Sequence, residues 1–229
     1  MKTKNQISDL SKKVGHDLKS PLRKIRQFAE LMMLEYSDVL GGDGEIYLDA
    51  LTESTEEVSD LVENLLIYVK CLTETPDITK VSLEEVIEVV SAQIYLKFGQ
   101  SVTLEDQRLP TVKADQNMSL LLFTHLLENA CRFVALDTSP NILIKLDETN
   151  ESAVIYIIDN GIGITGEGAD KVFDPLMRLH SKSDFKGSGL GLAICKAICE
   201  AHGWDIGFSN NAQGGTTFKV SLPVMQPSD

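Results

Sequence analysis

Leucine and valine recur every seven residues between positions 51 and 72, and this repeat constrains what the N-terminal third of the chain can fold into. A seven-residue spacing keeps one face of an α-helix apolar, which is the pattern of a helical bundle or a coiled coil. We therefore predict a long helix over residues 45–72. The repeating row consists of Leu51, Val58, Leu65 and Leu72, and its companion row of Leu61 and Tyr68.

Residues 5–40 carry apolar side chains at steps of three and four, so a second long helix is predicted there. The intervening Gly41-Gly42-Asp43-Gly44 is predicted to be a turn, because glycine is unfavourable inside a helix. The two helices are expected to form an all-α helical hairpin over residues 1–73. Since two helices enclose only a small core, we expect a second copy to complete a dimeric four-helix bundle.

A different pattern begins after Thr73. Pro76 cannot continue a helix, and residues 74–80 are predicted to be a linker. Residues 81–229 mix helix and strand patterns without strict alternation, which predicts an α/β (α+β) two-layer sandwich with helices on one face of a sheet. The predicted helices are 83–98, with Ser82 as its cap, 118–134 and 188–202, and the predicted strands are 141–146, 153–159, 205–209 and 216–222.

The chain of 229 residues has a formal net charge of −13. An acidic surplus of this size repels phosphate backbones, so no nucleic-acid partner is expected. No apolar run reaches the roughly 20 residues that a transmembrane helix requires. We therefore expect a cytoplasmic location, for the chain itself or as the cytoplasmic portion of a larger protein.

The four cysteines lie in apolar periodic stretches and none forms a C-x-x-C pair, which predicts buried, reduced thiols. Cys195, Cys199 and His202 share one predicted helical face, so a metal site is an alternative interpretation. A tetrahedral zinc site requires more ligands than these three, and buried thiols are therefore preferred.

His16 lies about half a turn from both Val14 and Leu18, so its side chain is predicted to face away from the apolar seam. A solvated surface histidine is one interpretation. Asp17 beside it can accept the Nδ1 proton and leave Nε2 as a nucleophile, which favours a reactive histidine. Pro21 lacks an N–H group, so the helix can kink just beyond His16.

The segment His16-Asp17-Leu18-Lys19-Ser20-Pro21-Leu22 resembles the phosphoacceptor box of sensor histidine kinases, and its continuation to Ile25 resembles the phytochrome-like and PAS-linked members. Further segments follow in the order of that family's nucleotide-binding boxes. A dinucleotide-binding loop of the Rossmann type is excluded, because a polar loop and not a strand precedes Gly187. The segments are 125–133 (the N-box), 159–164 (the first glycine box), 173–178 (the phenylalanine box), 187–194 (the second glycine box) and 214–218 (the last glycine turn).

The resemblance implies a dimerisation and phosphoacceptor hairpin followed by a Bergerat-type ATP-binding domain that uses ATP and Mg²⁺. It implies that Asn129 offers its oxygen to Mg²⁺, that Arg132 meets a phosphate and that Asp159 accepts a hydrogen bond from the adenine amino group. Backbone N–H groups before a helix suit a polyphosphate. The other implied nucleotide-binding residues are Gly161, Gly163, Lys182, Lys186, Gly187, Gly189, Leu190, Gly191 and Thr217, with Arg178 steadying the phosphates.

Three positions depart from the family pattern. His125 stands where these kinases commonly have Asn and where related ATPases have a water-activating Glu, so intrinsic ATP hydrolysis is not expected. Leu176 replaces the second phenylalanine of its box. Ser20 stands where members with phosphatase activity usually have Thr, Asn or Gln, so Ser20 is a candidate phosphatase position and that activity stays open.

The predicted function is that of an autophosphorylating protein histidine kinase of a two-component system. The γ-phosphoryl group passes in line to His16, with Asp17 as the general base, and then to an aspartate of a response-regulator receiver domain. The expected partners are a second copy, that receiver domain and an upstream sensor domain or protein. An ATPase switch of the same superfamily is one alternative, and an ATP-binding pseudokinase or docking module is the other.

Overall fold

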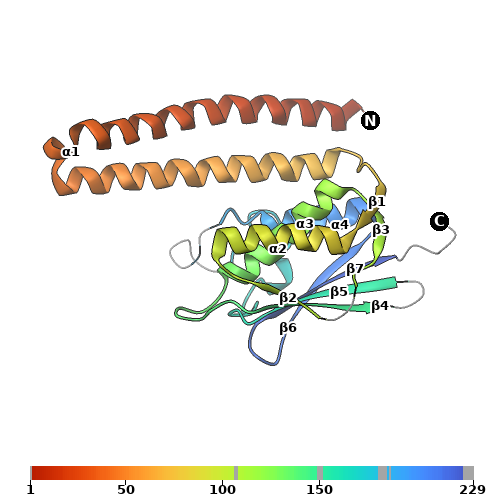
Figure 1. The fold of residues 1–229 in the computed structure, drawn as a ribbon. Helices are drawn as coiled ribbons and strands as arrows, with labels where there is room; N and C mark the ends of the chain where they lie inside the picture. The colour runs from red at the N-terminus through yellow and green to blue at the C-terminus, as the bar shows by residue number, and fades with distance from the viewer. Residues whose placement is uncertain (1, 106–107, 149–151, 180–184, 186, 224–229) are drawn as a thin grey trace. The chain divides into compact units, whose positions relative to one another are not determined.

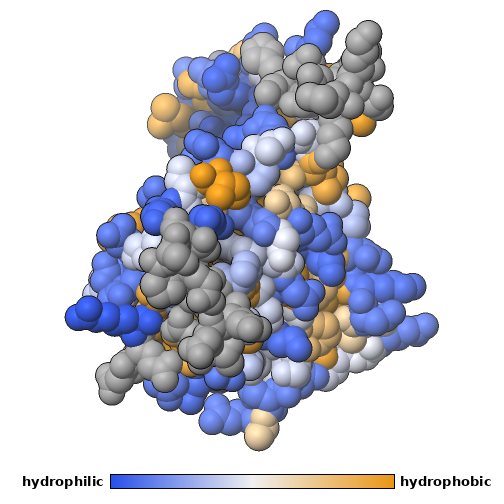
Figure 2. All heavy atoms as spheres, turned by 90° about the vertical axis from the view of Figure 1, so that its right-hand side faces the viewer, coloured by the Kyte–Doolittle hydropathy of each residue, from blue (hydrophilic) through white to orange (hydrophobic). Residues whose placement is uncertain are grey.

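The computed structural model describes residues 2–105, 108–148, 152–179, 185 and 187–223, except for the side chains of several helical residues that include His16. The chain divides into two compact units, Met1–Glu74 and Thr75–Asp229. Within the described residues no helix is long and apolar enough to cross a membrane. The face in Figure 2 is mainly hydrophilic, with hydrophobic residues in small groups, as the acidic composition leads one to expect.

The first unit is a single helical element, α1 (Lys2–Thr73), that reverses direction at Gly41 (Figure 1). Gly41 has φ 64° and ψ 177°, and it is the one described residue of α1 with non-helical dihedral angles. The predicted four-residue turn is therefore too long, because a single glycine at positive φ suffices to reverse the chain. Helical dihedral angles continue through Pro21.

Two contacts define how the arms of α1 lie against each other. Lys19 Nζ lies 3.2 Å from Glu63 Oε1. Gly15 is buried, and a Cβ atom on it would lie 2.3 Å from Leu66 Cδ1. In each pair the two residues lie equally far from Gly41 along the sequence, to within one residue. The two arms are therefore antiparallel and in register.

The buried residues of the hairpin are small or polar as often as they are large, and they include Gly15, Ala29, Leu48, Thr55 and Val62. The row predicted to form the seam is instead exposed, at 44–46% for Leu51, Val58, Leu65 and Leu72. Leu48, Thr55 and Val62 also repeat every seven residues, three positions earlier, and this row closes the hairpin. The predicted row is left at the surface of the single chain.

The second unit is a sheet covered by helices on one face (Figure 1). Its helices are α2 (Leu83–Phe98), α3 (Gln116–Arg132) and α4 (Gly191–His202), with a short 3₁₀ turn η1 (Ala169–Lys171). Helix α2 has the predicted bounds, and the predicted cap is confirmed, because Ser82 Oγ accepts the N–H of Glu85. Helix α4 begins three residues later than predicted, which leaves Gly187–Leu190 as a loop before it.

Five strands form the main sheet in the order β2-β4-β5-β7-β6. Alternate residues of β5 are buried under the helices, namely Ala153, Ile155, Ile157 and Asp159, so Asp159 ends the strand on its covered face. The strands are β2 (Val102–Leu104), β4 (Ile142–Glu148), β5 (Ser152–Asp159), β6 (Asp205–Asn210) and β7 (Thr216–Pro223).

Three short strands were not predicted from the sequence. Strands β1 (Thr79–Ser82) and β3 (Thr111–Ala114) pair antiparallel with each other, and β2 pairs parallel with β4. These strands have three or four residues, which is too short for a two-residue alternation to be distinctive. Strand β1 begins inside the segment predicted to be a linker.

Candidate functional site

Asp159 is a buried carboxylate at the end of β5, with 5% of its surface exposed. Its Oδ1 atom accepts the backbone N–H groups of Gly161 at 2.9 Å and Thr216 at 2.8 Å. Burial raises the pKa of Asp159, and these two hydrogen bonds only partly oppose the rise. Among the described residues no hydrogen bond engages Oδ2, so this oxygen is a ready acceptor.

Two glycine turns pack against each other beside Asp159. A Cβ atom on Gly161 would lie 2.3 Å from the Phe133 carbonyl oxygen, and one on Gly215 would lie 2.1 Å from the Asp159 carbonyl oxygen. Gly163 adopts a φ of 72°. The predicted glycines therefore permit close backbone packing here, and the packing places the N–H groups that orient Asp159.

Thr216 and not Thr217 lies on the covered face of β7 next to Asp159. Thr216 is buried, and Phe218 and Val220 follow on the same face. Thr217 is the cross-strand neighbour of Ile158, whose side chain points to the other face of the sheet. Thr216, and not the predicted Thr217, is thus the threonine that contacts Asp159. The nucleotide role of Thr217 stays a prediction.

The second glycine segment, Gly187–Gly191, leads directly into α4. Leu190 at its end is fully buried and anchors the loop, and within the described residues no side chain caps the helix. The first N–H groups of α4 are thereby left for a ligand, and the helix dipole favours an anionic one.

The phenylalanine-box segment lies against the same loop. Leu176 donates its N–H to the Gly189 carbonyl at 2.9 Å, and a Cβ atom on Gly189, which has φ 72°, would lie 3.0 Å from the Met177 carbonyl oxygen. Leu176 itself is exposed and has φ 65°, an unfavourable conformation for a leucine. The leucine that replaces the second phenylalanine of this box therefore has an exposed side chain, while its backbone lies in close contact with Gly189.

Arg178 binds backbone carbonyls of the loop that precedes α4. Its Nη1 donates to the Gly187 carbonyl at 2.6 Å, and its Nη2 donates to the Phe185 carbonyl at 2.7 Å. This guanidinium holds the loop in place, which differs from the phosphate contact expected from the sequence. Lys182 and Lys186, which were predicted to bind nucleotide, lie outside the described residues.

Three polar residues of the N-box segment, His125, Asn129 and Arg132, lie at helical spacing on α3 and are all half-buried. The Nδ1 atom of His125 lies 3.4 Å from the position of a Cβ on Gly191, so this histidine faces the start of α4. Burial lowers the pKa of His125, which is therefore neutral at pH 7. Its Nε2 atom is buried and has no hydrogen-bond partner among the described residues.

Asp115 and His202 join α3 to α4 in a contact that sequence reasoning missed. Asp115 caps α3, since its Oδ1 accepts the N–H of Met118, and its Oδ2 accepts the N–H of Asp77. The N–H of Asp115 donates to His202 Nε2 at 2.9 Å, so His202 Nδ1 carries the proton and donates to the Ile198 carbonyl. Both ring nitrogens of His202 thus have protein partners.

The four cysteines are buried and none forms a disulfide. Burial raises the pKa of Cys131 to about 11 and that of Cys199 to about 12, so both are unreactive thiols at neutral pH. The prediction of buried, reduced cysteines is confirmed.

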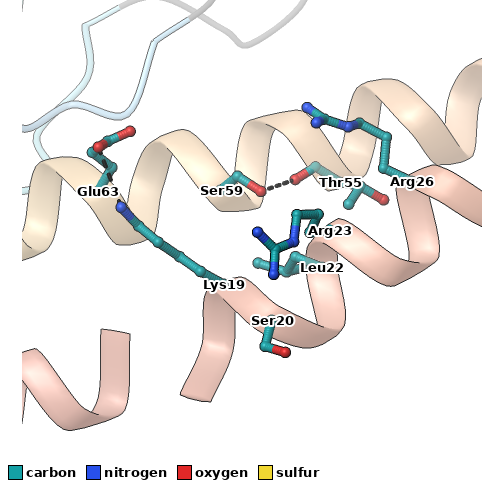
Figure 3. Close-up of a pocket in the computed structure, with 8 residues that line it drawn as sticks. All are labelled: Lys19, Ser20, Leu22, Arg23, Arg26, Thr55, Ser59 and Glu63. Carbon is teal, nitrogen blue, oxygen red and sulfur yellow. Dashed lines mark hydrogen bonds and ion pairs between the residues drawn. The ribbon is translucent and has the colours of Figure 1, made fainter. Parts of the chain in front are cut away.

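A groove of about 420 Å³ lies between the arms of α1, one helical turn beyond His16 (Figure 3). Lys19 reaches across it to Glu63, and Arg23 and Arg26 add positive charge from the first arm. Ser20, the candidate phosphatase position, lines the same groove. Asp17 is exposed, and the side chain of His16 lies outside the described residues, so the predicted orientation of the histidine stays a prediction.

A family model described as histidine kinase-, DNA gyrase B-, and HSP90-like ATPase matches residues 114–226. Phytochrome-like protein Cph1 of Synechocystis sp. is 32% identical over 211 residues, which are 92% of this chain and 28% of that protein. Sensor protein KdpD of Clostridium acetobutylicum is 33% identical over 223 residues, 94% of this chain and 24% of that protein. The chain therefore spans about a quarter of the length of these relatives.

Solved structures share the fold over most of the chain. Full-length ShkA in complex with AMPPNP matches with a TM-score of 0.71 over 95% of this chain and 46% of that one, at 18% identity. The histidine kinase AdeS of Acinetobacter baumannii matches with a TM-score of 0.63 over 92% of this chain and 98% of that one, at 22% identity. With the ordered boxes and the buried Asp159 between two glycine turns, these similarities lead to one conclusion: the chain is similar to the catalytic core of sensor histidine kinases.

Proposed function

We propose that this protein is an ATP-dependent histidine kinase that phosphorylates its own His16 and passes the phosphoryl group to an aspartate of a response regulator. The observation that carries the proposal is the buried Asp159, held through one oxygen between two glycine turns. It lies in a chain that also bears a phosphoacceptor box on a separate helical hairpin.

The adenine end of the site is Asp159. Two backbone N–H groups orient its carboxylate through Oδ1, so Oδ2 is directed to accept a hydrogen bond from the adenine amino group. Adenine is distinguished from guanine by this amino group, because guanine carries a carbonyl at the same place and two acceptors repel each other. Asp159 is thus the specificity residue for the base.

The phosphate end of the site is formed by the start of α4 and the polar face of α3. Backbone N–H groups of residues 187–191 and the helix dipole favour the phosphates, and Arg132 adds a positive charge. The carboxamide of Asn129 supplies an oxygen ligand for Mg²⁺, which neutralises phosphate charge when bound. The buried, unpartnered Nε2 of His125 supports this assignment, because such an atom is costly unless a ligand or a water bonds to it.

Phosphoryl transfer takes place when the ATP-binding unit brings the nucleotide to the hairpin. Nε2 of His16 attacks the γ-phosphorus in line, the bond to the β–γ bridging oxygen breaks, and ADP leaves. Asp17 accepts the Nδ1 proton and raises the nucleophilicity of the ring. Arg178 contributes by holding the loop before α4 through two backbone carbonyls.

The hairpin functions as half of a dimer. The exposed row Leu51, Val58, Leu65 and Leu72 on the second arm, with apolar residues such as Leu10, Val14, Leu18 and Phe28 on the first arm, is covered when a second hairpin packs against it. The receiver domain docks on this bundle near His16. A sensor portion or a separate sensor protein supplies the input, as the greater length of the relatives supports.

Labelling with γ-³²P-ATP and Mg²⁺ tests the proposal. Wild type should acquire acid-labile, alkali-stable label, His16→Gln should acquire none, and Asn129→Ala should lose labelling while the protein remains folded. Label that persists in His16→Gln would refute the acceptor. Wild type that binds ATP without labelling would favour a pseudokinase, and phosphate release without protein label would favour an ATPase switch.

A further inference from the structure

Glu128 lies on α3 between two cations that come from two different helices. Its Oε1 atom is 2.5 Å from Lys97 Nζ at the end of α2, and its Oε2 atom is 3.0 Å from Arg132 Nη2 one turn further along α3. The Glu128 side chain is only 16% exposed, so both of its oxygens are largely withdrawn from water and both are paired. A largely buried carboxylate needs such partners.

Arg132 reaches from this pair to the second glycine segment. While Nη2 is held by Glu128, Nη1 lies 3.8 Å from the position of a Cβ on Gly187. A guanidinium is rigid and planar, so fixing one nitrogen fixes the direction of the other. The Glu128 contact therefore directs Nη1 to the loop before α4.

The charges of the three residues explain why Lys97 is needed. Glu128 and Arg132 alone are neutral together, and a neutral pair attracts a polyphosphate weakly. Lys97 bonds the other carboxylate oxygen and gives the group of three a net charge of +1. Arg132 is thus held in place without losing its attraction for an anion.

We propose that Glu128 is a positioning residue that holds Arg132 ready for a nucleotide phosphate, with Lys97 as its counter-charge. The proposal rests on the phosphate role of Arg132 in the function proposed above. An arginine already fixed in its binding conformation loses less entropy when the ligand arrives, which is the source of the gain in affinity.

The test compares a ligand that carries phosphates with one that carries none. Binding of ADP with Mg²⁺ and of adenosine is measured by calorimetry on the full chain, for wild type, Glu128→Gln, Arg132→Gln and the double variant. Glu128→Gln raises the net charge of the group from +1 to +2, so charge alone would strengthen ADP binding. A loss of Arg132 positioning should instead weaken ADP binding by about tenfold, about 1.4 kcal/mol, and leave adenosine binding unchanged. In the Arg132→Gln background, Glu128→Gln should add nothing further.

Glu105→Gln is the matched control, because it breaks an exposed pair with Lys145 on the sheet. It should change neither affinity, and thermal unfolding verifies that each variant is folded. Equal losses for ADP and adenosine in Glu128→Gln would show a merely structural role and overturn the proposal. If Arg132→Gln lowers ADP affinity and Glu128→Gln does not, the positioning role of Glu128 alone is overturned. Full ADP affinity in Arg132→Gln would also overturn the phosphate role of Arg132.

Discussion

The hairpin and the ATP-binding unit differ in how each buries its apolar residues. The second unit has a closed core in which residues such as Phe123, Ile155 and Ile157 are fully buried between helices and sheet. The hairpin encloses small or polar residues, including Gly15 and Thr55, and leaves Leu65 46% exposed. Hydrophobic burial stabilises roughly in proportion to area, so the second unit completes its core within one chain and the hairpin does not.

This difference fits the two tasks proposed for the units. A nucleotide site requires buried, fixed groups such as Asp159, because electrostatic contacts are stronger away from water. An acceptor histidine that two proteins must approach in turn requires an exposed helix face. In the function proposed above, the chain therefore combines a self-sufficient domain with one that a second copy completes.

The largest expected effect is the loss of the dimer in Leu65→Glu. A carboxylate in the apolar row would be buried without a partner in the dimer, so the dissociation constant should rise by at least about 100-fold. Light scattering after size exclusion, over a range of concentrations, measures it. Leu96→Glu, on an 85% exposed site of α2, is the control and should leave the dimer intact. A fully dimeric Leu65→Glu would contradict the assignment of this row.

Asp159→Asn should separate binding from stability in the second unit. The Asn oxygen can still accept the two backbone N–H groups, but its NH₂ group would face the adenine amino group. ADP affinity should therefore fall by roughly 10- to 100-fold, as expected for a lost hydrogen bond to a charged group. Calorimetry measures this loss.

The stability of Asp159→Asn should not fall below that of wild type at pH 7, because the wild-type carboxylate has a raised pKa. A group with a raised pKa favours the folded state when protonated, so this contribution is lost as the pH rises through the folded-state pKa. The stability of Asp159→Asn should thus exceed that of wild type at pH 7–8, and the difference should shrink in acid. A variant that is clearly less stable at pH 7 would argue for a structural role of the charge.

Gly15→Ala tests the close approach of the two hairpin arms. The added methyl group would meet the end of the Leu66 side chain, which must leave its rotamer, and we expect a loss of about 1 kcal/mol in the free energy of unfolding. Amide hydrogen exchange should localise the loss to the hairpin. Gly42→Ala has no atom within 4 Å of the new Cβ and should instead stabilise the helix. Equal changes in the free energy of unfolding for Gly15→Ala and Gly42→Ala would count against the close contact between Gly15 and Leu66.

His125→Asn should change the response of stability to acid. Burial lowers the pKa of His125 below its usual value of 6.5, so the unfolded chain takes up the proton first and wild type loses stability as the pH falls from 6.5 through the lower folded-state pKa. The Asn variant lacks this contribution. Denaturant unfolding at pH 7.5 and pH 5.5 should show a smaller decrease for the variant, and identical decreases would refute the buried neutral histidine.

Periodicity and local chemistry by themselves determine much of this protein. The seven-residue row and the glycines at 41–44 predicted the hairpin, although Gly41 alone makes the turn. Ser82 and the apolar spacing predicted α2 with its observed bounds. The resemblance of the segment around Asp159 and of the glycine-rich segments to known nucleotide-binding boxes predicted a nucleotide site, because these motifs are local in the chain; the roles of the individual residues stay predictions.

Tertiary structure decided which of several equivalent residues face each other. Two rows three residues apart on the second arm both repeat every seven residues, and only the packing of the first arm shows that Thr55 faces inward and Leu65 outward. The pairing of Lys97 with Glu128, and that of Asp115 with His202, joins residues 31 and 87 positions apart. No local sequence pattern predicts such long-range pairs, because they depend on how separate elements pack once the core has formed.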